Sequence, residues 1–134
     1  MPRPPRVHVP GGVYHVTLRG NHRQDIFRAP ADRRRWEDVL GESLERVGAR
    51  LHAYCWMTNH AHLVVQVGDM PLGGLVRRLA SRYARWFQQD VPTTGHLFER
   101  RYGAQLIGTD SYLLAVARYI PYNPVRAQLA AAPD

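Results

Sequence analysis

Hydrophobic and polar residues along the first half of the chain recur with two different periods. Three segments alternate at every second residue, as half-buried strands do, and one repeats every three to four residues, as a helix does. The helical repeat follows Pro30 and stops at Gly48, which are residues typical of a helix start and a helix end. Thr58-Asn59 separates two of the strands and is short enough to form a hairpin turn. The pattern therefore predicts a strand at Val13–Arg19, a helix from Pro30 to Gly48, and strands at Arg50–Met57 and His60–Val67.

The second half of the chain continues with helices and one more strand. A helix is predicted from Pro71 to about Asp90, a strand at Ala104–Ile107, and helices at Ser111–Ile120 and Pro124–Ala131. The order strand, helix, strand, strand, helix, strand, helix is typical of an α+β protein. It predicts a ferredoxin-like split βαβ fold, in which helices cover one face of an antiparallel sheet.

Composition and charge narrow the class of partner. The chain has 134 residues, a formal net charge of +7 and 18 basic residues, all of them arginine, so we expect a single domain over residues 1–134 that binds an anion, nucleic acid first. A GC-rich coding sequence would also favour arginine over lysine. No segment is apolar enough to cross a membrane and the basic start does not resemble a signal peptide, so no membrane partner and a cytoplasmic location are expected. A single Cys55 excludes an internal disulfide and a cysteine-based zinc site within one chain.

Arginine residues gather on one side of the helix predicted after Pro71. At about 100° per residue, one side of this helix carries Leu75, Leu79, Tyr83 and Trp86 and is expected to pack. The other side carries no acidic residue and four arginines, Arg77, Arg78, Arg82 and Arg85, which we call the arginine ridge. A solvated charged face is the alternative interpretation, but the absence of acids favours phosphate contacts. Arg100 and Arg101 are further candidates for contact with DNA.

Two histidines, His60 and His62, lie two residues apart in a predicted strand. Side chains at this spacing point to the same face, roughly 6.6 Å apart along the strand. Leu63 and Val65 would lie on the opposite, buried face, so the strand would present both imidazoles outward. This arrangement suits one divalent ion, although a chance pair held by hydrogen bonds or solvent is the alternative. A histidine triad of the nucleotide-hydrolase kind is disfavoured, because Val64 occupies the next position on that face.

Two segments taken together resemble a known family. Residues 58–65, Thr-Asn-His-Ala-His-Leu-Val-Val, are similar to the histidine, hydrophobic, histidine motif of the HUH single-tyrosine transposases. Residues 118–127 resemble the tyrosine helix of the REP-associated branch of that family, and residues 13–21 and 97–102 are similar to further segments of the same branch. The resemblance spans about residues 13–129 and adds a C-terminal tyrosine helix to the expected fold.

The resemblance implies metal-dependent cleavage of single-stranded DNA. His60 and His62 would hold Mg²⁺ or Mn²⁺, Asn123 stands where the family has a polar third ligand, and Tyr119 would be the nucleophile. Attack would leave a 5′-phosphotyrosine and a free 3′-hydroxyl, so that strands at hairpin, REP-like DNA are cleaved and rejoined. The implied partner is single-stranded or hairpin DNA.

Three questions stay open at the level of sequence. Pro121 can kink the tyrosine helix, and Asn123 followed by Pro124 also fits the N-cap of a final helix. Some members of the family form dimers that combine histidines and tyrosine from two chains, so both a monomer and a homodimer are compatible with the sequence. A non-catalytic protein that binds structured DNA is the alternative function, and a replication initiator or relaxase of the same histidine class is a third.

Overall fold

A four-stranded antiparallel sheet and two long helices form the part of the chain that the structure describes. The structure is a computed structural model, and it describes residues 8–89 and 95–108. Its elements are β1 (Val13–Arg19), a short 3₁₀ helix η1 (Asn21–Arg23), α1 (Pro30–Val47), β2 (Arg50–Trp56), β3 (His60–Gln66), α2 (Leu72–Phe87) and β4 (Gly103–Gly108).

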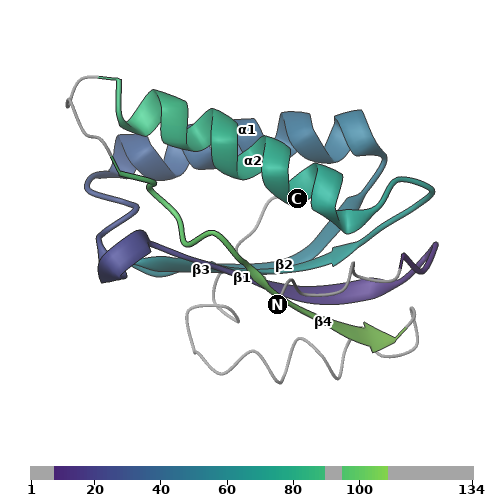
Figure 1. Ribbon diagram of the computed structural model, residues 1–134. Helices are drawn as coiled ribbons and strands as arrows, with labels where there is room; N and C mark the ends of the chain where they lie inside the picture. Colours follow the sequence, from purple (N-terminus) through teal and green to yellow (C-terminus); the bar gives the residue numbers. More distant parts are fainter. Residues whose placement is uncertain (1–7, 90–94, 109–134) are drawn as a thin grey trace.

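The strand order in the sheet is β2-β3-β1-β4, and each neighbouring pair is antiparallel. The chain passes from β1 through α1 to β2, which leaves room for β3 between these two strands. It then passes from β3 through α2 to β4 on the far side of β1. Both helices cover the same face of the sheet (Figure 1). The predicted ferredoxin-like fold is confirmed. Separately, none of the described helices is long and apolar enough to span a membrane.

Within the described residues, the predicted boundaries of the elements hold to within a few residues, whereas the helices predicted at 111–120 and 124–131 lie outside the described residues. Proline stands at the start of α1, and Gly48, in the left-handed conformation at φ 69°, ends it. The two-residue turn after β2 is confirmed, since the Met57 N–H donates to the His60 carbonyl across it at 2.8 Å. The helix α2 ends at Phe87, because Gln88 has left helical geometry at ψ 3°, whereas the prediction ran to about Asp90, which lies outside the described residues.

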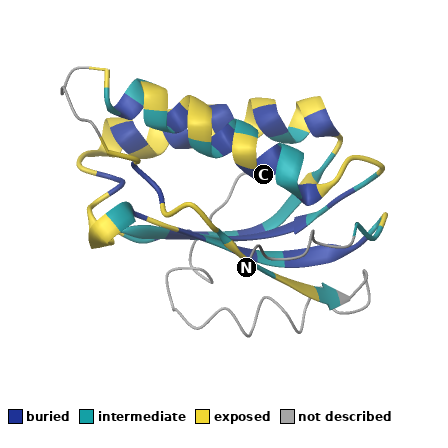
Figure 2. Cartoon of the chain, in the orientation of Figure 1, coloured by how far each residue is buried: buried dark blue, intermediate teal, exposed yellow. Residues whose placement is uncertain are grey.

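The main core lies between the sheet and the two helices, where Figure 2 shows the inward sides of α1 and α2 as buried. Its centre is an aromatic cluster in which the Trp36 and Tyr83 rings meet edge to face, 5.1 Å between centroids. The sheet contributes Ala61, Leu63 and Val65 from β3 to this core. Because side chains alternate along a strand, the residues between them must face the other side of the sheet.

That other side carries the two histidines of the sequence motif together with a second, smaller buried cluster. The cluster consists of Val13, Ala53, Cys55 and Val64, which are at most 1% exposed. Cys55 thus has the role of a small buried hydrophobic residue. Anchored between two apolar layers, β3 is a rigid support for the residues on its outer face.

A strained turn follows β1 at the end of the sheet where β3 begins. His22 and Arg23, neither of them glycine, have positive φ angles of 55° and 62°. Residues held in this region cost on the order of 1–3 kcal/mol each, so the surroundings must hold them there. The Gly20 N–H donates to the Asn59 carbonyl at 2.8 Å, and the Asn21 N–H donates to the Leu97 carbonyl at 2.7 Å. The turn is thus tied to the β2–β3 hairpin and to the segment that precedes β4.

Gly20 is the position in this turn where a side chain is least tolerable. A Cβ at Gly20 would lie 2.0 Å from the Gln24 carbonyl oxygen, a backbone atom that cannot rotate away. We expect Gly20→Ala to lower the free energy of unfolding by about 2 kcal/mol or more, as overpacked sites do. Gly41→Ala is the matched control, because a Cβ there meets nothing within 4 Å. In the helix interior it should stabilise the protein by about 0.5–1 kcal/mol. Urea denaturation of both variants measures the difference, and equal effects would contradict the crowding at Gly20.

Candidate functional site

His60 and His62 lie side by side on the outer face of β3, as the sequence predicts. Both side chains are half-buried. Their ring centroids are 4.9 Å apart, and the ring planes are nearly perpendicular at 84°. The strand register places Arg19 directly opposite His60 and Thr17 directly opposite His62 on β1. The site therefore combines residues from two adjacent strands.

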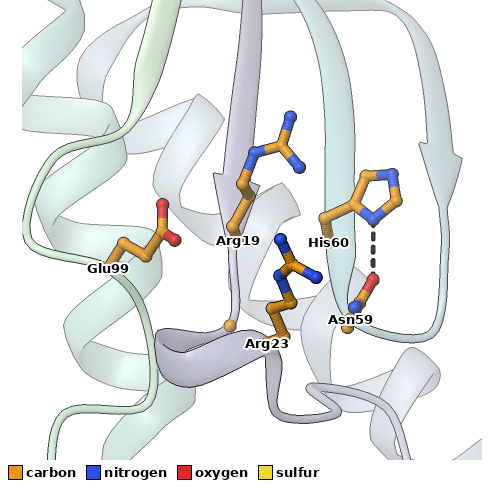
Figure 3. A pocket seen from close by; sticks show the side chains of 6 residues that line it. Arg19, Arg23, Asn59, His60 and Glu99 are labelled. Carbon is orange, nitrogen blue, oxygen red and sulfur yellow. Dashed lines mark hydrogen bonds between the residues drawn. The ribbon is translucent and has the colours of Figure 1, made fainter.

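His60 is oriented by the residue that precedes it. Its Nδ1 lies 2.8 Å from Asn59 Oδ1, an acceptor, so the ring must donate its Nδ1–H to this oxygen (Figure 3). In the neutral ring the lone pair is then on Nε2. Histidines that bind metals typically have one nitrogen held by such a polar neighbour, which fixes both the tautomer and the ring orientation.

His62 is held in the same way, by β1. Its Nδ1 lies 3.1 Å from His15 Nε2 and 3.3 Å from Thr17 Oγ1. The tautomer of His62 that carries its proton on Nδ1 donates to one of these atoms and leaves the lone pair of Nε2 available. With His62 in this tautomer, both histidines of the motif have an oriented ring and an Nε2 that can serve as a ligand.

Burial keeps these imidazoles neutral. Burial, together with smaller contributions from the nearby His15, His60 and Arg19, lowers the pKa of His62 to about 4. Burial also lowers the pKa of His60, with a second contribution from Arg19, and burial lowers the pKa of His15. Since an imidazole must be neutral to bind a metal ion, these shifts favour ligation at and below neutral pH.

The same shifts predict acid sensitivity of the metal-free protein. Above the ordinary histidine pKa of about 6.5 these rings are neutral in the folded and the unfolded chain. Below it the unfolded chain binds protons first, so the free energy of unfolding falls as the pH decreases towards the folded pKa, about 4 for His62. We expect a smaller loss of thermal stability between pH 7 and pH 5 for His62→Gln than for the natural protein, in buffers of equal ionic strength. The exposed His96 gives the control variant His96→Gln, and equal acid sensitivity of all three proteins would refute the explanation.

The described residues offer two candidate metal ligands, His60 and His62, and not a complete set. Among residues 8–89 and 95–108, no group of three or more histidine, cysteine, aspartate or glutamate side chains is arranged to hold a metal ion. Two imidazoles with oriented rings fit a divalent ion only if further oxygen ligands complete the shell. The predicted third ligand Asn123 and the predicted nucleophile Tyr119 lie outside the described residues, and so does Pro121.

A hollow of about 390 Å³ opens beside His60. It is lined by Arg19, Gly20, Arg23, Asn59, His60 and Glu99, which come from β1, the strained turn, the β2–β3 hairpin and the segment before β4 (Figure 3). The Glu99 N–H donates to the Arg19 carbonyl at 2.9 Å, which joins the segment before β4 to the end of β1. His60 therefore borders a concave surface that also carries two guanidinium groups.

The arginine ridge lies elsewhere. The helix α2 covers the face of the sheet opposite to the histidines, so Arg77, Arg82 and Arg85, all exposed, are on the far side of the sheet from His60 and His62. Arg78 is only half exposed. Although α2 itself carries no acid there, Asp38 and Glu42 of α1 line a shallow hollow together with Arg82 and Arg85. Trp86, which was expected on the packed face, is half-buried and borders the same hollow.

The other two DNA-contact candidates lie closer to the histidines. Arg100 and Arg101 are exposed and directly follow Glu99, which lines the hollow beside His60. Six arginines were predicted to contact DNA. The structure places Arg100 and Arg101 near the histidine site and the four arginines of the ridge away from it.

Four residues of the site were not singled out by the sequence analysis: His15, Thr17, Arg19 and Arg23. The alternation within β1 places the first three on one face, which is a signal that the sequence contains. Their contact with β3 depends on the strand register, and Arg23 depends on a turn with unusual backbone angles. Neither feature is readable from spacing alone.

Comparisons with known proteins agree with this fold. The family model described as "Transposase IS200 like" matches residues 8–123. No curated protein matches the chain significantly. A solved structure of a REP-associated tyrosine transposase bound to a REP hairpin is similar, with 17% sequence identity over 96% of this chain and 76% of that chain, and a TM-score of 0.71. A crystal structure of a candidate transposase from Deinococcus radiodurans R1 is also similar, with 18% identity over 88% of this chain and 95% of that chain, and a TM-score of 0.61. Likeness at such identities establishes the shared fold.

Proposed function

This chain belongs to the IS200-like transposase family, and on that premise we propose that it is a metal-dependent transposase that cleaves and rejoins single-stranded DNA at hairpin, REP-like sequences. The motif resemblance predicted the family correctly. One observation best supports metal-dependent cleavage. The Nδ1 atoms of His60 and His62 are engaged by neighbouring side chains, while both Nε2 atoms remain available to a metal ion. A protein that only binds DNA gains nothing from two oriented neutral imidazoles.

His60 and His62 would hold the ion, Mg²⁺ or Mn²⁺, and Asn123 would add an oxygen ligand. When bound, such an ion draws charge from a non-bridging phosphate oxygen and makes the phosphorus more open to attack. The hard character of both ions calls for oxygen atoms from water and DNA in the remaining positions. Asn59, His15 and Thr17 would keep the imidazoles oriented, and ligands held in this way bind more tightly than free ones.

Tyr119 would carry out the chemical step. Its hydroxyl oxygen forms a bond to phosphorus and loses its proton, while the bond from phosphorus to the 3′ oxygen breaks and that oxygen leaves as a 3′-hydroxyl. The product is a 5′-phosphotyrosine. The covalent bond conserves the energy of the phosphodiester, so attack by the 3′-hydroxyl of another strand rejoins DNA without a nucleotide cofactor.

The strand register is compatible with a tyrosine of the same chain. Gly108, the last described residue, is paired with Val13, whereas His62 is paired with Thr17, four residues further along β1. At about 3.3 Å per residue this is a separation of roughly 13 Å along the strand. If residues 111–119 are helical, as the sequence predicts, they span roughly 13 Å at 1.5 Å per residue. A segment that turns back along the sheet would then reach the level of the histidines, while a tyrosine from a second copy is the other arrangement.

The proposed substrate is a hairpin with a single-stranded flank. The net charge of +7 favours a polyphosphate. The similar REP-associated transposase was solved with a REP hairpin, which supports the same class of substrate here. A hairpin supplies duplex phosphates for exposed arginines, and its flank supplies a phosphodiester that can enter a concave site.

The test uses a pool of single-stranded oligonucleotides with randomised stem-loops and flanks, incubated with protein and Mn²⁺. After denaturation, an enzyme that forms a 5′-phosphotyrosine retains the label of 3′-labelled strands and releases 5′-labelled fragments. Retention of the 5′ label alone would contradict the proposed polarity. DNA binding without any adduct, at every metal concentration tested, would favour the non-catalytic binding protein instead.

A further inference from the structure

We propose that the hollow beside His60 is a phosphate-binding subsite, in which Arg19 and Arg23 hold a backbone phosphate of the single-stranded DNA next to the one at the histidines. This inference rests on the proposed function, because it assigns the place where the substrate strand enters the same site. It gives a role to Arg19 and Arg23, which belong neither to the histidine motif nor to the arginine ridge.

The shape and position of the hollow fit such a role. Its volume of about 390 Å³ is within the range of sites that accept small ligands, and it is open to solvent, as an extended strand requires. His60 forms part of its wall, and Arg19 faces His60 across the β1–β3 pair. A phosphate in the hollow and a phosphate at the imidazoles would therefore be neighbours.

The charges in the hollow favour an anion. Two guanidinium groups face a single carboxylate, Glu99, and Figure 3 shows both guanidinium groups between Glu99 and His60. Within the described residues, the one salt bridge joins Arg28 to Asp32. Neither Arg19 nor Arg23 is therefore neutralised there by a paired carboxylate. Arginine also has the planar set of donors that matches phosphate oxygens.

The strained turn is the second, independent observation. The backbone of Arg23 is held in the left-handed region at φ 62°, directly after His22 at φ 55°. Hydrogen bonds from Gly20 and Asn21 to two other segments, and from the Gln24 side chain to the His96 carbonyl at 3.1 Å, keep the turn in place. Strain that persists in this way concentrates at binding sites, where it preorganises a side chain before the ligand arrives. Here the side chain it directs into the hollow is Arg23.

The experiment measures binding of fluorescein-labelled dT8 by anisotropy, without metal, so that it does not depend on cleavage. We expect Arg23→Gln to weaken binding about tenfold, the loss of one charge-assisted phosphate contact. Arg34→Gln is the matched control, because Arg34 is exposed on α1 on the other side of the sheet, and it should change the affinity less than about twofold. Glu99→Gln removes the opposing charge and should tighten binding. Equal affinities of Arg23→Gln and Arg34→Gln would overturn the subsite.

A measurement on the natural protein covers the case in which the Arg23 variant folds poorly. The arginine side-chain Nε resonances of Arg19 and Arg23 should shift in ¹⁵N spectra when dT8 is added, and should not shift with a dT8 whose linkages are neutral methylphosphonates. Shifts confined to Arg82 and Arg85 would overturn the subsite in favour of the ridge.

The two proposals fail separately. A protein that forms the covalent adduct but binds dT8 without Arg23 retains the proposed function and loses the subsite. A protein that needs Arg23 for dT8 but never forms an adduct retains the subsite and loses the enzymatic activity.

Discussion

His62→Ala should reduce formation of the covalent protein–DNA adduct by about a thousandfold or more, the largest loss that we expect from any described residue. The substitution removes one of two oriented ligands and leaves His60 as the single imidazole on this face. A lone imidazole holds a hard cation poorly, so added Mn²⁺ should restore little activity. The yield of adduct on 3′-labelled DNA, measured against Mn²⁺ concentration, gives the effect.

Two further measurements show whether this loss comes from the missing metal ligand. DNA binding without metal should stay within about twofold of the natural protein, because neutral His62 contributes no charge to phosphate contacts. His15→Ala keeps both ligands and removes the neighbour at 3.1 Å from His62, so it should weaken the apparent Mn²⁺ affinity by about 10–100-fold and respond to added metal. A His62→Ala protein that forms adducts at the natural rate would rule out the histidine pair as the metal site.

Tyr119→Phe should reduce adduct formation below detection while DNA binding survives. Phenylalanine has nearly the same shape as tyrosine but lacks the hydroxyl oxygen that would become bonded to phosphorus. No excess of metal can compensate, which distinguishes this loss from that of His15→Ala. The adduct assay and the dT8 anisotropy assay, applied to one preparation, measure both properties.

Tyr112 and Tyr122 provide the controls for this substitution, since both belong to the same C-terminal region, outside the described residues. Their phenylalanine variants should keep most of the adduct yield. Retention of full activity in Tyr119→Phe, combined with its loss in one of these two, would assign the nucleophile to that other tyrosine and leave the metal site untouched.

The placement of the arginines affects how DNA is expected to lie on the protein. Phosphates at the ridge on α2 and a phosphate at the histidines would be on opposite faces of the sheet. A substrate that contacts both must pass around an edge of the molecule. Arg19 and Arg23 line the hollow beside His60, and Arg100 and Arg101 follow Glu99 of the same hollow. These four arginines offer a shorter path than the ridge for the strand that we propose is cleaved.

The sequence by itself determined the elements and the orientation of the histidine pair. The alternation in β3 and the helical spacing in α1 are local, because each depends on residues a few positions apart. Pro30 and Gly48 marked the ends of α1 for the same reason. His60 and His62 had to share a face in any strand that buries Leu63 and Val65, so this part of the site needed no knowledge of the rest of the fold.

Only the tertiary structure decided which residues surround that pair. His15 meets His62 across 47 positions of sequence, and Arg19 lies opposite His60, because β1 and β3 are neighbours in one register. The arginine ridge lies away from the histidines because α2 packs on the other face of the sheet, and the turn that follows Gly20 places Arg23 in the hollow beside His60. The physical reason is that strand pairing and layer packing join distant segments, whereas periodicity describes only how a segment presents its own side chains.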